Sequence, residues 1–352
     1  MRRRLLIVLV GAAVPALAAG LVRAGTAVTA AGFLRENMSP RLVAMGGLKS
    51  SVPDGPGSVQ SNPAGLSMTG RPEFQSTYLN SQVQSMTGFA AYAHPFFTNP
   101  RFGLGFGAGF IYHTAGNIDI NSIDGTSRSL NAETSYAGLL SLGARAGSIA
   151  VGVSPKFVRS TLVEQYSARA FAADVGALIY FFPKTWKDRV VAGFLLQNLG
   201  TKLKYLSDEH DLPRTQVAGL SVRLWEHRDY GSLLWSWEAE RTLGETGRYR
   251  FGGEYSVGAD ADPRAFFMRG GFRVHFDGED YSFGVGIRER NLEVSYAFVN
   301  GTELSNLHRL GIGFRFGSYR KVLPERDEVD DMFKGLEGSE RYRLLELEKI
   351  RD

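Results

Sequence analysis

Bulky apolar side chains alternate with glycine between Arg101 and His113, and similar runs recur towards the C-terminus. The bulky positions are Phe102, Leu104, Phe106, Ala108, Phe110 and Tyr112, and Gly103, Gly105, Gly107 and Gly109 lie between them. A period of two places the bulky side chains on one face of a β-strand. In a soluble sheet the other face is usually charged, whereas a membrane barrel can turn aromatic rings to lipid and small groups to its lumen. A dinucleotide-binding loop also carries spaced glycines, but it joins a strand to a helix, and these glycines lie within the strand.

We count fourteen alternating runs from Glu73 onwards. They cover residues 73–81, 86–96, 101–114, 132–145, 148–161, 168–182, 189–199, 213–225, 231–242, 248–257, 265–276, 280–289, 291–299 and 307–317. An even number of strands fits a single-chain bacterial barrel. If both chain ends are periplasmic, odd-numbered connections are external, and the long gaps 115–131 and 200–212 are connections three and seven. The pattern predicts an all-β fold, an antiparallel transmembrane β-barrel of about 14 strands over residues 73–317.

The two faces of the late runs differ in chemistry. One face is apolar and would contact lipid: Tyr249, Phe251, Tyr255, Val257, Phe266, Met268, Phe272, Val274, Phe276, Tyr281, Phe283, Val285, Ile287, Leu292, Val294, Tyr296 and Phe298. The other face is charged: Glu238, Glu240, Arg250, Glu254, Arg269, Arg273, His275, Arg288, Glu293, Arg309 and Arg315. We expect the charged set in the lumen, where opposite charges on facing strands can pair. This set is either a structural network that braces an internal plug or a selectivity surface.

The N-terminus has the features of a secretory signal peptide. Three arginines, Arg2 to Arg4, precede an apolar stretch that ends in Ala16-Leu17-Ala18, and a second candidate cleavage point follows Ala24. The whole chain has 40 basic and 36 acidic residues, and residues 1–24 contain four arginines and no acidic residue, so cleavage leaves 36 of each. The basic character therefore belongs to the leader, and a nucleic-acid partner is not expected.

Two further segments lack the strand pattern. Residues 25–72 are rich in glycine, proline, serine and asparagine, which predicts irregular structure compact enough for a confined space. Residues 318–352 are charged and helix-prone, with Ser339 as a candidate N-cap, and predict a helical periplasmic tail. This tail would be either a solvated helix or a docking helix for a partner.

Catalytic and cofactor chemistry finds no support in the sequence. The chain has no cysteine, and its six histidines show no metal-ligand spacing. No serine, histidine and acid are placed by a known motif, so neither an enzyme nor a cofactor is predicted. Pro155 lies inside a predicted strand, where it removes a ladder hydrogen bond. It is either a harmless bulge or a kink that opens the barrel wall.

Four ordered motifs resemble the PorV/PorQ family of outer-membrane proteins, which are relatives of the FadL long-chain fatty-acid transporters. They are Arg41 to Gly47 followed by Asn62-Pro63-Ala64-Gly65-Leu66, then Ala172 to Tyr180, then Gln197 to Gly200, and finally Leu212-Pro213-Arg214. The chain departs from the family pattern at Pro53 to Gly57, where acidic and alanine residues are common.

The resemblance implies a barrel with residues 25–72 folded inside as a hatch. The residues that it assigns to hatch gating are Met45, Gly46, Gly47, Asn62, Pro63, Ala64 and Gly65. It implies a location in the bacterial outer membrane, with lipid around the barrel and both termini in the periplasm. The function implied is passage or binding of a hydrophobic small molecule. The alternative is a scaffold or shuttle for exported proteins, similar to components of the type IX secretion system, with secretion partners.

Overall fold

The computed structural model describes residues 29–80, 85–98, 102–121, 127–181, 190–227, 230–258, 264–276, 281–301 and 306–317. The predicted signal peptide and the predicted helical tail lie outside these residues. Among the residues described, no helix has both the length and the apolar character needed to cross a bilayer.

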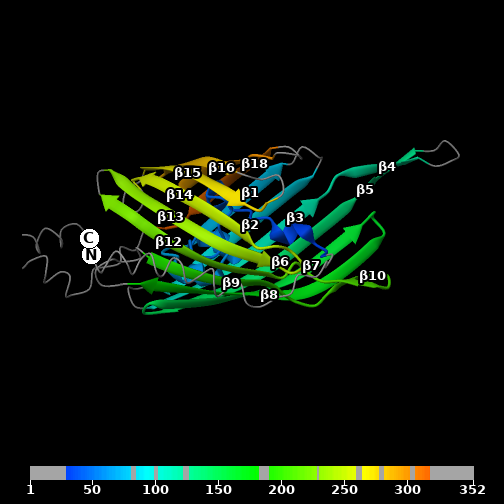
Figure 1. Ribbon diagram of the computed structural model, residues 1–352, viewed down its shortest axis with the longest axis horizontal. Coiled ribbons are helices and arrows are strands. Elements are labelled where there is room, and N and C mark those ends of the chain that lie inside the picture. The colour runs from blue at the N-terminus through cyan, green and yellow to red at the C-terminus, as the bar shows by residue number, and fades with distance from the viewer. Residues whose placement is uncertain are drawn as a thin grey trace, which may run out of the picture. The chain divides into compact units, whose positions relative to one another are not determined.

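Fourteen antiparallel strands form a closed barrel (Figure 1). In barrel order they are β1 (Glu73–Asn80), β2 (Met86–Thr98), β3 (Phe102–Thr114), β6 (Glu133–Ala146), β7 (Ile149–Leu162), β8 (Tyr166–Phe181), β9 (Val190–Gly200), β12 (Thr215–His227), β13 (Gly231–Thr242), β14 (Arg248–Val257), β15 (Arg264–Val274), β16 (Tyr281–Glu289), β17 (Leu292–Val299) and β18 (Leu307–Arg315). The barrel closes where β1 pairs with β18, in a register that sets Glu73 opposite Arg315. Every strand of the barrel falls on one of the predicted runs, so the 14-stranded antiparallel barrel is confirmed.

Two small hairpins were not predicted. They are β4 (Asn117–Asn121) with β5 (Ser127–Asn131), and β10 (Leu203–Tyr205) with β11 (Asp208–His210). Each lies in one of the two long connections, and Figure 1 shows β4 and β5 projecting from one end of the barrel. Strands of three to five residues are too short to display a period. We call the end of the barrel that carries these hairpins the opposite end. We call the end where β1 begins and β18 finishes the terminal end.

One left-handed residue breaks the alternation at the end of β15. His275 has φ of +64° and is exposed, with its ring edge-on to Tyr249 at 6.0 Å. The next residue, Phe276, turns inward, where the guanidinium groups of Arg248 and Arg250 lie 4.9 and 4.8 Å from its ring centre. The prediction that His275 faces the lumen and Phe276 faces lipid is therefore wrong. The left-handed backbone at His275 interrupts the alternation, so that the His275 side chain points outward and the Phe276 side chain points inward.

Residues 29–72, here called the inner segment, lie inside the barrel as four short helices joined by turns. They are η1 (Gly32–Arg35), α2 (Pro40–Ala44), η2 (Gly55–Val59) and η3 (Pro63–Met68). Proline at the first helical position and a polar cap start two of them: Ser39 Oγ accepts from Leu42 N–H, and Asn62 Oδ1 accepts from Ala64 N–H. Because Ser39 and Asn62 are each only 2% exposed, these caps satisfy donors that would otherwise be buried unpaired.

Inward glycines let the backbone of the inner segment approach the wall closely. A Cβ added at Gly105 would meet the carbonyl oxygen of Leu66, and one added at Gly152 would meet the backbone of Pro63 and Ala64. The same holds around the barrel, where Gly193 faces Ser50 and Gly252 faces Met45. The glycines between the bulky positions of β3 therefore mark where another part of the chain packs.

We predict that Gly143→Ala lowers the free energy of unfolding by about 1–3 kcal/mol, the cost of overpacking a filled interior. Its added Cβ would lie 2.5 Å from Pro63 O and 3.0 Å from Ser67 N. Gly138→Ala, in the same strand with nothing within 4 Å of the added Cβ, is the control. Denaturant unfolding of the refolded barrel measures both variants. Equal stability of the two variants would contradict close packing at Gly143.

Candidate functional site

The lumen has an apolar side and a charged side. On the apolar side, Phe33, Leu34, Met38, Val59 and Leu66 of the inner segment pack in one buried cluster with wall and connection residues. The wall and connection residues of this cluster are Leu79, Phe89, Ala91, Ala93, Ile111, Ala137, Leu139, Val158, Ala168, Ala170, Ala172, Leu203 and Leu212. Many of them are alanine, so the wall contributes little bulk and the inner segment fills the space. Non-directional packing makes most of the contact on this side, and a few hydrogen bonds add to it, such as Ser154 Oγ to Val59 O at 3.1 Å and Ala30 N–H to Asp211 O at 3.1 Å.

On the charged side, Glu238 holds the backbone of the inner segment. Its carboxylate is fully buried and accepts hydrogen bonds from the backbone N–H groups of Lys49, Ser50 and Ser51, at 2.7, 2.7 and 3.0 Å. The Ser50 hydroxyl donates to the same carboxylate at 2.8 Å. A carboxylate bonded to several backbone amides is strongly held, because each bond is charge-assisted. Glu238 therefore fixes residues 49–51 against β13.

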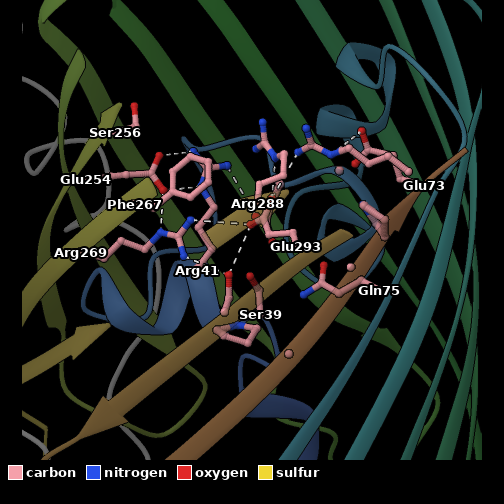
Figure 2. Close-up of a pocket in the computed structure, with 18 of the residues that line it drawn as sticks. Ser39, Arg41, Glu73, Gln75, Glu254, Ser256, Phe267, Arg269, Arg288 and Glu293 are labelled. Atoms are coloured by element: carbon pink, nitrogen blue, oxygen red, sulfur yellow. Dashed lines mark hydrogen bonds and ion pairs between the residues drawn. The ribbon is translucent and has the colours of Figure 1, made fainter. Parts of the chain in front are cut away.

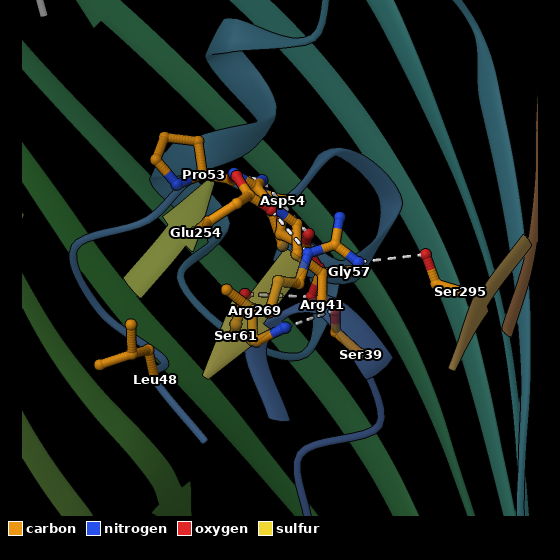
Figure 3. A network of polar contacts seen from close by, with 12 residues as sticks. Ser39, Arg41, Leu48, Pro53, Asp54, Gly57, Ser61, Glu254, Arg269 and Ser295 are labelled. Carbon is orange, nitrogen blue, oxygen red and sulfur yellow. Dashed lines mark hydrogen bonds and ion pairs between the residues drawn. The ribbon is translucent and has the colours of Figure 1, made fainter. Parts of the chain in front are cut away.

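Arg41 and Glu254 make a second attachment (Figure 3). Arg41 donates to both carboxylate oxygens of Glu254, at 2.8 and 2.7 Å, and Arg269 Nε donates to the same group at 2.7 Å. Arg41 also donates to the carbonyl oxygen of Pro53 at 2.9 Å and lies 3.6 Å from Asp54. One arginine thus connects α2, the turn before η2 and the barrel wall.

Three further predicted residues contact the inner segment near the opposite end. Arg273 Nε donates to Gly46 O at 3.0 Å, and Arg309 donates to the Glu36 carboxylate at 2.5 Å. Glu240 pairs with Arg250 and lies 3.4 Å from Lys49 Nζ. Burial alone would raise the pKa of Glu36, but the charges of Arg309, Arg273 and Lys49 hold it below its usual value. The predicted polar set thus meets the inner segment along several strands.

The remaining predicted residues gather at the terminal end, beside a cavity of about 220 Å³ (Figure 2). Arg288 Nε lies 3.1 Å from Glu293, and Arg315 lies 3.5 Å from Glu293 and 3.4 Å from Glu73. A second cavity, of about 310 Å³, lies at the opposite end beside Arg248, Arg273 and Arg309. Both cavities border the inner segment, and both are lined mainly by polar groups.

The residues predicted to gate the hatch lie at turns of the inner segment. Gly46 and Gly47 follow α2 in the left-handed region, with φ of +77° and +79°, directly after Met45. Asn62 caps η3, which contains Pro63, Ala64 and Gly65, and its Nδ2 donates to Ser50 O at 2.7 Å. Met45 to Gly47 therefore lie at the turn that ends α2, and Asn62 to Gly65 lie at the start of η3. Their gating role stays a prediction.

Pro155 lies on the outer face of β7, where the pairing with β6 is interrupted. The ladder runs to Leu139 opposite Lys156 and resumes at Leu142 opposite Val153, in unchanged register. On the lumen side of this break Ser154 Oγ donates to Val59 O at 3.1 Å, so the inner segment covers the interruption.

A buried polar group beside this break was missed in the sequence. Lys156 Nζ lies 2.7 Å from Asp174 Oδ1, and Asn198, with φ of +60°, donates its N–H to the same oxygen at 2.7 Å. The β8–β9 register shifts between Ala173 and Val175. Asp174 and Asn198 both fall in motifs that carry the family resemblance. These motifs were the one feature of the sequence that could have pointed to this group. Within the described ranges, no three His, Cys, Asp or Glu residues are grouped to hold a metal ion.

Asp54 is a titratable group of the inner segment whose ionisation is perturbed. Burial raises the pKa of its carboxyl from 3.8 to about 6, and the positive charge of Arg41 offsets only part of this effect. The folded chain therefore binds this proton more tightly than the unfolded chain.

The barrel is similar to solved outer-membrane channels. The toluene transporter TbuX of Ralstonia pickettii aligns with a TM-score of 0.52 and 13% identity, covering 80% of this chain and 99% of that one. The toluene transporter TodX of Pseudomonas putida aligns at 0.52 and 12%, covering 79% and 96%, and the monoaromatic hydrocarbon channel CymD at 0.52 and 11%, covering 80% and 98%. No family model and no curated protein matches the sequence. At this identity the likeness shows a shared fold.

We predict that Glu238→Gln loosens the inner segment, with a loss of about 2–3 kcal/mol. The new amide would place an NH₂ group against a backbone N–H where Glu238 has an accepting oxygen. Trypsin cleavage after Arg41 or Lys49 in the detergent-solubilised protein should become faster. Glu289→Gln, which disturbs only an exposed pair with Arg264, is the control. Unchanged cleavage in Glu238→Gln would contradict the attachment.

We predict that Asp54→Asn removes a pH dependence of stability. Because the folded-state pKa exceeds the ordinary value, the Asp54 contribution is largest below about pH 4, falls between about pH 4 and 6, and is constant above. The variant should exceed the wild type by up to about 3 kcal/mol at pH 8 and match it near pH 4. Denaturant unfolding at both pH values measures the difference, with the exposed Asp208→Asn as the control for charge. A gap that does not change with pH would refute this assignment.

Proposed function

We propose that this chain is a non-enzymatic barrel of the bacterial outer membrane that passes a hydrophobic small molecule across that membrane. The observation that carries the proposal is a 14-stranded barrel whose lumen is occupied by an inner segment held by charge on one side and by apolar packing on the other. The shared fold with toluene and monoaromatic hydrocarbon channels supports it.

The outer surface supports the membrane location. Large apolar side chains are exposed at alternate positions, for example Phe266, Met268 and Phe272 on β15. The two long hairpin connections are both at the opposite end, and outer-membrane barrels carry their longer loops outside and their short turns in the periplasm. This comparison supports placing the terminal end, where β18 finishes, on the periplasmic side. The first described residues, Thr29 and Ala30, lie at the opposite end beside Asp211, so they give no support to the predicted periplasmic N-terminus.

The apolar side of the lumen is the proposed route. Phe33 and Leu34 of the inner segment meet Leu203 and Leu212 of a connection at the opposite end, and the same apolar cluster extends to Val59. Both described cavities are polar, so a hydrocarbon would favour this cluster over either of them. Because the cluster is closely packed, passage requires the inner segment to move away from the wall.

The interrupted ladder at Pro155 is the proposed exit. Val59 covers the break from inside, and Leu140 and Val153 are exposed on the outer side near it. If Val59 moved, an apolar molecule could leave sideways into lipid without crossing the polar cavity at the terminal end. The predicted gating role of Asn62 to Gly65, which begin three residues after Val59, belongs to this proposal.

No observation favours the alternative secretion scaffold. The tail and the external connections 115–131 and 200–212 motivated it. The tail lies outside the described residues, and the connections carry short hairpins that indicate no particular partner. The structural neighbours reported above are hydrocarbon channels. The PorV/PorQ resemblance stays a prediction from the sequence motifs.

We predict that Ala170→Phe slows uptake of apolar probes at least about tenfold, because its side chain would fill the apolar side of the lumen. Ala177→Phe, facing outward on the same strand, is the control. Uptake of a panel that includes toluene is measured in cells that express each variant at equal levels. Cells that lack the protein give the background rate of uptake. If cells that express the wild type take up no probe faster than this background, the transport proposal fails.

A second variant tests the exit. Pro155→Val supplies the missing N–H and should restore the β6–β7 ladder. We expect slower uptake with unchanged folding, as judged by heat-dependent mobility on gels. Uptake equal to the wild type for every probe would rule out the opening while leaving transport by another path.

A further inference from the structure

The cavity at the opposite end is strongly cationic. Six basic side chains line it: Arg35, Lys49, Arg248, Arg250, Arg273 and Arg309. The carboxylates on the lining are Glu36 and Glu240, and Glu245 lies just behind them, 2.6 Å from Arg35 and 3.0 Å from Arg248. Among the described residues, six positive charges against three negative ones leave a surplus of three in a space of about 310 Å³. Concentrated charge of one sign in a lumen with low-dielectric walls attracts counter-ions.

Several buried donors on this lining have no hydrogen-bond partner among the residues that the structure describes. They are Nε of Arg248, Nε of Arg250, and both Nε and Nη1 of Arg309. Arg250 and Arg309 are only 5% and 2% exposed. Their other nitrogens bind Glu240 and Glu36, so each guanidinium is oriented by a carboxylate while part of its N–H set stays unpaired. Buried N–H groups without an acceptor are unfavourable, which indicates an acceptor from outside the chain.

We propose that this cavity binds a tetrahedral oxyanion of the phosphate class, either free phosphate or the phosphate group of a small solute. Guanidinium groups present paired N–H donors that match the oxygens of such an anion. An anion of charge about −2 would offset most of the surplus of three, and its oxygens would accept from the unpaired nitrogens. An apolar ligand could do neither.

The site joins the wall to the inner segment. Glu36, Gly47 and Lys49 come from the segment, whereas Arg250 and Arg309 come from β14 and β18. A bound oxyanion would therefore bridge the two and favour the seated position of the segment. The inference goes beyond the proposed function, because it holds whichever molecule the barrel passes.

The test is direct binding of radiolabelled inorganic phosphate to the full-length protein in a phosphate-free detergent with 150 mM chloride, on the order of physiological ionic strength. We expect saturable binding at a single site. Arg248→Gln and Arg273→Gln should each weaken it about tenfold or more, and the double variant should abolish it. Glu245 keeps its ion pair with Arg35 when Arg248 is changed. Arg264→Gln, which removes one exposed positive charge outside the cavity, should bind like the wild type.

Competition identifies the source of the anion. Tighter binding of glycerol 1-phosphate than of inorganic phosphate would indicate a phosphorylated solute, and the reverse order would indicate free phosphate. Absence of saturable binding to the wild type would overturn the proposal, and so would displacement by chloride as readily as by unlabelled phosphate. Undiminished binding in a double variant that retains the heat-dependent gel mobility of a folded barrel would also overturn it.

Discussion

Close contact between the backbone of the inner segment and the barrel wall is the constraint on which the rest of this structure depends. Eight strands can fill a barrel with their own side chains, but fourteen enclose too much space. Here residues 29–72 fill it, and their peptide groups lie directly on inward glycines such as Gly105 and Gly152. Polar backbone brought this close to a wall needs partners. Helix caps within the segment and carboxylates on the wall, chiefly Glu238, supply them.

The division of the lumen follows from how those partners are distributed. Charged anchors come from β13 to β18, where Glu238 and Glu254 hold the segment in defined positions through hydrogen bonds. The wall from β1 to β8 offers alanine and a few larger apolar side chains, which have no directional preference. The proposed movement away from the apolar side would break packing contacts and a few hydrogen bonds, such as Ser154 to Val59, and would leave the ion pairs of the charged side in place. This asymmetry is the physical basis for locating the proposed route beside Ala170 rather than beside Arg269.

Burying a charged side chain costs free energy unless it has a partner. The pairing of the buried charges therefore separates those that hold the inner segment from those that could bind an anion. Each buried carboxylate of the charged side has at least one arginine or several backbone N–H groups, as with Glu254 between Arg41 and Arg269. Around the cavity at the opposite end, positive charge exceeds negative, and donors on Arg250 and Arg309 stay unpaired. The same kind of side chain thus braces the inner segment at one place and forms a candidate anion site at another.

The period-two alternation was sufficient to predict all fourteen barrel strands, because burial on two chemically different faces imposes that period on every strand locally. It also picked out the charged residues of β13 to β18. The error at His275 and Phe276 arose because alternation assumes regular backbone, and one left-handed residue is invisible to it. Only the tertiary structure decided which peptide groups Glu238 binds, that Asp174 meets Lys156 and Asn198 beside the wall break, and that arginines from β14, β15 and β18 converge on one cavity. These contacts join residues far apart in the chain, and no local pattern encodes the barrel closure and the seating of the inner segment that bring them together.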